Sequence, residues 1–168
     1  VTNTTFASHS TTVFAKYEFD NWSLRMQAIV SQNMDAHLLM GGYAESPFDE
    51  AALAYTYQPF GGYTAWMDFG KSTGKWRPGV FFGYAKNTGF EKPVDDTWLF
   101  YGGRGLDIDF VWRIQPRIGW YVSPNIQFFA EVEYTVAGYG VNPDDYYRYE
   151  SANNVANTRF ILAAVYKF

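Results

Sequence analysis

The side chains best suited to acid–base or metal chemistry in this sequence are its two histidines, His9 and His37, and a few carboxylates. Neither histidine has a second histidine or a carboxylate at metal-ligand spacing, so surface positions explain both better. Asp35 close to His37, and the pair Asp95–Asp96, have suitable residue types, but acid–base catalysis needs a positioned set of groups. The sequence also lacks cysteine, a G-x-S-x-G motif and a phosphate-binding glycine loop. We therefore expect no enzyme activity, no catalytic residues, no metal site and no cofactor.

The remaining chemistry-bearing side chains are charged residues that alternate with apolar ones. In residues 106–122, LDIDFVWRIQPRIGWYV, this alternation predicts a β-strand with one apolar and one polar face. At about 3.3 Å per residue it exceeds the roughly 9–11 residues that a tilted strand needs to cross a bilayer. The apolar face carries Leu106, Ile108, Phe110, Trp112, Ile114, Ile118, Trp120 and Val122, interrupted by Pro116, and the polar face carries Asp107, Asp109, Arg113 and Arg117.

A hairpin positions four of these charges. Residues directly opposite in an antiparallel pair share a face, so residues 123–125, Ser-Pro-Asn, are predicted to form a three-residue turn to the next alternating segment. This register places Arg117 opposite Glu131 and Arg113 within diagonal reach of Glu133.

A second hairpin is predicted in residues 13–30. The apolar residues there change from odd-numbered to even-numbered positions, which requires a loop with an even number of residues, and Asp20–Asn21 makes a two-residue turn. Lys16 then lies directly opposite Arg25, which destabilises the strand pair unless the charges are solvated or compensated. Glu18, diagonal to Arg25, is the expected compensating group.

The rest of the chain contains weaker alternating segments at 37–45, 51–58, 63–69 and 76–86. Two long polar segments, 87–105 and 140–156, are predicted to be exposed loops. The acidic stretch DDYYRYE at 144–150 has residue types that suit calcium or sugar binding, but a hydrated loop is the simpler interpretation. With no helical segment and no linker, residues 1–168 form one all-β domain.

Composition limits the protein class. Aromatic residues make up 21% of the 168 residues, hydrophobic residues 48%, and the net charge is −4. This mildly acidic chain is not suited to nucleic-acid binding, and the absence of cysteine excludes a disulfide scaffold. No apolar run approaches the roughly 18–20 residues of a membrane-spanning helix.

Strands with one apolar and one wet face fit two environments. A soluble sandwich or ligand-binding barrel turns its apolar face inward, whereas a membrane barrel turns it toward lipid. Aromatic residues near the strand ends, and short turns that alternate with long polar loops, favour the membrane barrel. The soluble barrel remains the alternative.

The C-terminal segment FILAAVYKF resembles the last strand of Gram-negative outer-membrane β-barrels, which typically end on an aromatic residue after alternating apolar positions. Phe168 matches the terminal aromatic, and Tyr166, Ala164, Leu162 and Phe160 match the alternating positions. The segment RIGWYVSPNIQFFAEVEY is similar to the strand–short turn–strand unit of porins, those of Bacteroidetes among them. The resemblance implies an outer-membrane location, and it implies that the barrel-assembly machinery reads Phe168 and Tyr166.

The expected fold is therefore an antiparallel transmembrane β-barrel with about 8–10 strands in this chain. Because about nine strands are counted and bacterial barrels have an even number, either residues 1–10 hold another strand or the chain is the C-terminal part of a larger barrel.

The expected function is a porin-like channel for small hydrophilic solutes or ions. The alternative is a small plugged barrel that acts through its loops in adhesion, in a complex or as a rim enzyme. Expected partners are outer-membrane lipid, the assembly machinery and further subunits of a homo-oligomer or membrane complex. The predicted pore-lining residues are Lys16, Glu18, Arg25, Asp68, Asp107, Asp109, Arg113, Arg117, Glu131, Glu133 and Arg159.

Overall fold

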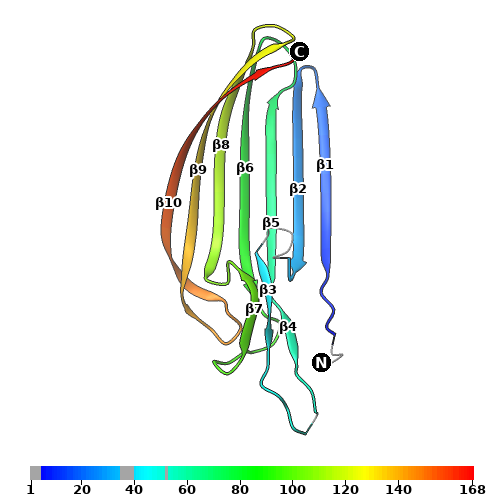
Figure 1. Ribbon diagram of the computed structural model, residues 1–168, viewed down its shortest axis with the longest axis vertical. Coiled ribbons are helices and arrows are strands. Elements are labelled where there is room, and N and C mark those ends of the chain that lie inside the picture. The colour runs from blue at the N-terminus through cyan, green and yellow to red at the C-terminus, as the bar shows by residue number, and fades with distance from the viewer. Residues whose placement is uncertain (1–4, 35–39, 52) are drawn as a thin grey trace.

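The computed structural model describes residues 5–34, 40–51 and 53–168, which form an all-β structure with antiparallel sheets (Figure 1). Asp35 and His37 lie outside the described residues. Within them, no helix is long and apolar enough to cross a membrane. Seven strands form the larger sheet in the order β1-β2-β5-β6-β8-β9-β10. These are β1 Ser10–Phe19, β2 Trp22–Gln32, β5 Gly61–Lys71, β6 Trp76–Gly89, β8 Ile108–Tyr121, β9 Ile126–Pro143 and β10 Tyr149–Tyr166.

A smaller sheet holds the packed core of the described residues. It has the order β4-β3-β7, with β3 Gly41–Glu45, β4 Tyr57–Pro59 and β7 Leu99–Arg104. The two largest fully buried side chains, Phe60 and Phe90, meet here at a ring-centroid distance of 5.3 Å, beside Ala44 and Val94. The strand expected over 51–58 is wrong in extent, because β4 begins at Tyr57, and Ala54 before it makes an isolated bridge with Asp49.

Both predicted hairpins are confirmed. Phe19 pairs with Trp22 around the Asp20–Asn21 turn, and the backbone N–H of Val122 donates to Ile126 O at 3.0 Å around residues 123–125. Asp20 takes a left-handed φ of 48°, a conformation typical of two-residue hairpin turns. Whether the apolar residues occupy odd or even positions in each strand was therefore sufficient to predict both registers.

The two ends of the larger sheet differ. The turns at 20–21, 72–75 and 122–125 lie at the end where the chain finishes (top of Figure 1). The three other connections, together with the smaller sheet, lie at the opposite end. Two of these three connections are long, as predicted, whereas β9 and β10 are joined by the short loop 144–148. We call the two ends the short-turn end and the long-connection end.

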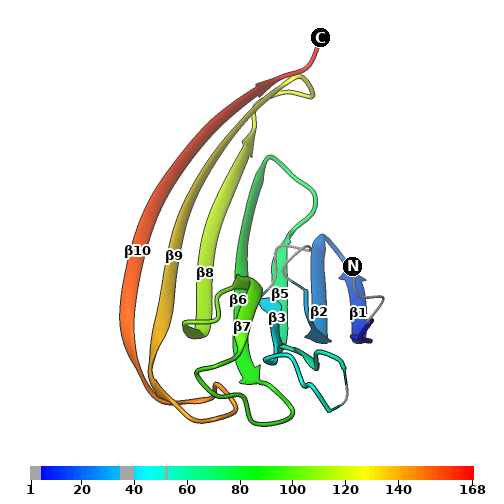
Figure 2. The ribbon, with the colours of Figure 1, turned by 60° about the horizontal axis from the view of Figure 1, so that its bottom comes forward.

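The larger sheet is open. Figure 2 shows it curving in an arc from β10 to β1, with the two edge strands apart. Six successive antiparallel pairings connect β1 to β10, so the two edges run in the same direction. The described residues thus form a curved antiparallel sheet, and the closed barrel expected from the sequence is not seen in them.

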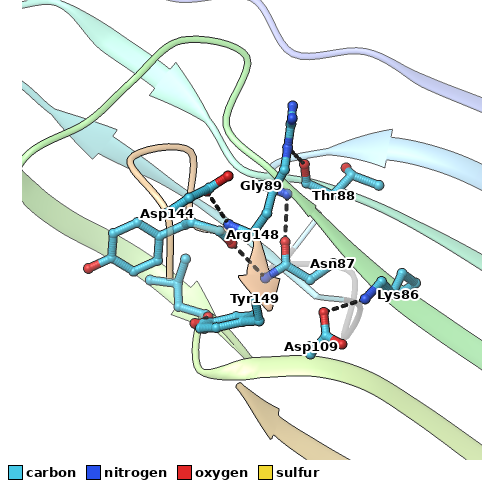
Figure 3. Close-up of polar contacts among 10 residues, drawn as sticks. Lys86, Asn87, Thr88, Gly89, Asp109, Asp144, Arg148 and Tyr149 are labelled. Atoms are coloured by element: carbon cyan, nitrogen blue, oxygen red, sulfur yellow. Dashed lines mark hydrogen bonds and ion pairs between the residues drawn. The ribbon is translucent and has the colours of Figure 1, made fainter. Parts of the chain in front are cut away.

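The predicted exposed loop over 140–156 is wrong for most of its length. β9 continues to Pro143 and β10 begins at Tyr149, which leaves only residues 144–148 as a loop. The loop docks on the end of β6 and the residues that follow it. Backbone N–H groups of Phe90 and Val94 donate to Tyr146 O and Asp145 O at 2.8 and 2.7 Å. Figure 3 shows the side chain of Asn87 bridging this loop and Gly89.

Candidate functional site

One face of the larger sheet is apolar from edge to edge. Large apolar side chains on it are strongly exposed, among them Leu162 at 84%, Phe160 at 77% and Val13 at 66%. Soluble monomers rarely expose a continuous apolar surface beyond a few hundred Å². This face is therefore of the kind that lipid or another apolar surface usually covers. One register row across six neighbouring strands reads Ala15, Met26, Met67, Phe82, Ile114 and Tyr134.

Two bands of aromatic side chains border this apolar face. The band at the short-turn end contains the ring contacts Trp22–Phe69, Trp76–Trp120 and Trp120–Phe128. The band toward the long-connection end contains Tyr63–Tyr84, Tyr84–Phe110 and Trp112–Tyr134.

The spacing of the two bands suits a bilayer. Trp76 and Tyr84 lie in opposite bands on β6, eight residues or about 26 Å apart along the strand. At the usual tilt of 35–45° this corresponds to about 20 Å across a bilayer, close to the roughly 25 Å apolar band of outer-membrane barrels.

The opposite face is polar, and several of its charged side chains are partly buried. It carries an ion-pair network in which the carboxylate of Glu133, only 10% exposed, accepts from two arginines. Arg113 and Arg159 reach it at 3.2 and 2.9 Å, and Arg113 Nε also donates to Thr135 Oγ1 at 2.9 Å. The predicted proximity of Arg113 and Glu133 is confirmed.

Arg117 lies opposite Glu131 in the backbone register, as predicted, but the two side chains have other partners. Arg117 forms an ion pair with Asp68 of β5 at 2.7 Å, while Glu131 accepts a hydrogen bond from Gln115. The Arg117–Asp68 pair joins strands that are not neighbours, because β6 lies between them.

Lys16 lies opposite Arg25, as predicted. Glu18, however, pairs with Lys16 on its own strand at 2.7 Å, instead of forming the expected contact with Arg25. The guanidinium of Arg25 makes no hydrogen bond or ion pair with any described residue. Its cross-strand neighbour Asp68 is already bound by Arg117.

Two of the predicted pore-lining residues lie away from the regular polar face. Asp107 sits in the exposed turn before β8. The register of β8 is irregular between Ile108 and Phe110, and the carboxylate of Asp109 pairs with Lys86. Lys86 has Phe110 as its register partner, so this ion pair belongs to the aromatic band near the long-connection end. An irregular register shifts side-chain alternation, which the sequence pattern did not reveal.

Sequence reasoning also missed Arg77, whose guanidinium stacks on the Tyr121 ring at 3.6 Å. Alternation with Trp76 would have placed it on the polar face.

Of the residues considered for catalysis, His9, Asp95 and Asp96 lie in the described part of the chain, whereas Asp35 and His37 lie outside it. Across the part of the chain that the structure describes, no group of three or more acidic or histidine side chains could hold a metal ion. The carboxylate of Asp95 accepts hydrogen bonds from the hydroxyl and backbone N–H of Thr97, and these hold the pKa of Asp95 below its ordinary value. They form a local turn, not an acid–base pair.

The two predicted assembly-signal residues lie at the short-turn end. Tyr166 is the last residue of β10 and its ring lies 6.2 Å from that of Phe168, with both side chains largely exposed. Comparisons with protein-family models, curated proteins and solved structures found no match to this chain.

Proposed function

We propose that the larger sheet is part of an outer-membrane β-barrel whose polar face lines a channel for small hydrophilic solutes. One observation supports this most directly. A continuous, exposed apolar face covers all seven strands, directly behind a face that carries ion pairs. In lipid, that arrangement buries the apolar side chains in hydrocarbon and keeps the charged ones in water.

Barrel closure imposes a condition on this proposal. Because β1 and β10 run in the same direction, an antiparallel closure needs an odd number of further strands between them. Such strands would also satisfy the unpaired backbone groups of both edges, which cannot remain exposed in hydrocarbon. A further segment of the natural chain or a neighbouring subunit would supply them.

The proposed function involves diffusion without catalysis. Charged side chains along the polar face would favour polar solutes over apolar ones and would set the ion preference. The outer membrane is the proposed location, with its lipid and the assembly machinery as partners.

Planar-bilayer recording tests the channel. The natural full-length protein, refolded and added to the bilayer, should produce discrete conductance steps. Protein that inserts, as judged by protease protection of its strands, but never conducts would reject the channel.

A loop-based binding function is the second candidate. The smaller sheet exposes apolar side chains at the long-connection end, including Leu99 at 57%. Replacing residues 144–148 with a short Gly-Ser turn separates the two candidates, because a channel should still conduct whereas a loop-based binder should lose its partner.

A further inference from the structure

A polar pocket lies at the short-turn end of the larger sheet. It consists of a cavity of about 290 Å³ and a smaller one of about 120 Å³ that share Arg25, Lys71 and Arg117. The larger cavity also has Arg77, Tyr121 and Phe129 in its wall, and the smaller one has Ser23 and Asp68. We call the two cavities together the Arg25 pocket.

The Arg25 pocket has excess positive charge. Four cationic side chains line it, against the single carboxylate of Asp68. That carboxylate is neutralised by Arg117 through contacts at 2.7 and 2.8 Å. Arg77 donates to Gly74 O at 3.1 Å and stacks on Tyr121. The side chains of Arg25 and Lys71 make no hydrogen bond or ion pair within the described residues, so two cationic groups are available to a ligand.

A buried hydroxyl independently points to a ligand. Ser23 is 8% exposed, and its Oγ is the one buried side-chain polar atom without a hydrogen-bond partner among the described residues. It lines the smaller cavity beside Arg25 and Lys71. A buried hydroxyl without a hydrogen-bond partner destabilises the fold, so an acceptor oxygen in the cavity would stabilise it.

One wall of the larger cavity is aromatic. The rings of Tyr121 and Phe129 meet edge to face at 5.8 Å. Gly119 of β8 is the register partner of Phe129, and a Cβ atom built on it would lie 3.0 Å from Tyr121 Cε2 and 3.1 Å from Phe129 Cε1, so its lack of a side chain leaves room for both rings. This wall offers apolar contact beside the cationic groups, which a fully hydrated inorganic ion would not use.

We propose that the Arg25 pocket binds a small organic anion. Its carboxylate or phosphate group accepts from Arg25, Lys71 and Ser23 Oγ, and its apolar part lies against Tyr121 and Phe129. The inference rests on the proposed function in one respect, because the pocket selects solutes only if the polar face lines a channel. The pocket itself requires only the folded sheet.

Binding of benzoate to the natural full-length protein, refolded in a non-ionic detergent and followed by isothermal titration calorimetry, tests the site. Benzamide serves as the uncharged analogue and acetate as the anion without a ring. Benzoate should bind at least about tenfold more tightly than either, because the charge-assisted bonds and the aromatic contact are both needed. Equal binding of benzoate and benzamide would overturn the proposal.

Three variants locate the site. Arg25→Gln should weaken benzoate binding about tenfold and Ser23→Ala several-fold, since charge-assisted bonds exceed neutral ones. Arg159→Gln is the matched control, because Arg159 also lies on the polar face but is paired with Glu133 and does not line the pocket. It should bind like the natural protein, and equal losses in all three variants would contradict the assignment. Conductance recorded separately distinguishes failure of the channel from failure of the site.

Discussion

Arg117 of β8 binds Asp68 of β5 through two contacts, Nη1–Oδ2 at 2.7 Å and Nη2–Oδ1 at 2.8 Å, although β6 separates the two strands. The guanidinium crosses β6 above Gly79. A Cβ atom built on Gly79 would lie 3.1 Å from Arg117 Cζ. A residue without a side chain thus permits a bidentate pair that ties three strands together on the polar face.

A double-mutant cycle of Arg117→Gln and Asp68→Asn should give a coupling free energy of about 1 kcal/mol. This is the upper end of exposed pairs, because both side chains are partly exposed and the geometry is bidentate. Urea unfolding of the refolded protein measures it. In a Gly79→Val background the coupling should fall toward zero, because the added methyl groups occupy the path of the guanidinium. Unchanged coupling in that background would show that Arg117 reaches Asp68 by another route.

Glu133→Gln should shift the ion preference of the proposed channel toward anions. The carboxylate of Glu133 neutralises part of the charge of both Arg113 and Arg159, so removing it leaves two cationic side chains without a partner carboxylate on the polar face. The anion-to-cation permeability ratio, obtained from the reversal potential in a salt gradient, should rise about twofold or more at low ionic strength.

Glu150→Gln is the charge-matched control for Glu133→Gln, because Glu150 lies exposed near the start of β10 at the long-connection end. It should leave the reversal potential close to that of the natural protein. Equal shifts in both variants would indicate a general effect of net charge, not a local one.

The sequence was sufficient where a strand alternates regularly and a short turn follows it. Parity placed Lys16 opposite Arg25 and Arg117 opposite Glu131, and both registers are confirmed. It could not reveal that β6 pairs with β8 while β7 joins the other sheet, because that depends on contacts between distant segments. The Arg117–Asp68 pair follows from this strand order and was therefore missed.

Local irregularity and strand extension explain the other differences. The irregular register at Asp109 lies within a segment that alternates without a break in the sequence. Residues 149–156 were predicted to be a loop because neither face of β10 carries a regular row of large apolar residues there. That is expected for strands that extend beyond an apolar band, where no hydrophobic pattern marks them.

Gly89→Ala should release the loop at 144–148. Gly89 has a left-handed φ of 76°, and an added Cβ would lie 2.1 Å from the backbone oxygen of Tyr146, which accepts the N–H of Phe90. Trypsin cleavage after Arg148, followed by mass spectrometry, should become about tenfold faster once the loop opens. Gly74→Ala is the control, because Gly74 also has a positive φ, 92°, but lies at the short-turn end. Protection of Arg148 in both variants would contradict the docking.

Tyr149 should make the folded protein less stable at alkaline pH. It lies beyond the aromatic band near the long-connection end, and its hydroxyl donates to Leu106 O. Burial raises the pKa of Tyr149 to about 12. Since the unfolded side chain ionises near pH 10, its contribution to stability is intact below pH 10 and is lost as the pH rises toward 12. Tyr149→Phe should reduce the loss of stability across this window, measured by urea unfolding at several pH values. An identical pH dependence in the variant would show that Tyr149 titrates normally.

Two neighbouring positions on β10 test the orientation of the whole sheet. Leu162 lies on the apolar face between the two aromatic bands, in register with Ala130, whereas Ala163 points to the polar face in register with Phe129. If the apolar face meets hydrocarbon, Leu162→Arg should destabilise the protein refolded in lipid vesicles by about 1–2 kcal/mol. Leu162 lies one register row from the Trp120–Phe128 contact of the short-turn band, and the cost of arginine falls from about 2–4 kcal/mol at the bilayer midplane to about 0–1 kcal/mol near an interface. Ala163→Arg adds the same charge one residue away and should cost less than about 1 kcal/mol, because its side chain reaches water. Unfolding in urea, followed by tryptophan fluorescence, gives both values. The reverse order would mean that the apolar side chains pack inside the sheet's concavity, as in a soluble barrel, and it would remove the basis for a channel.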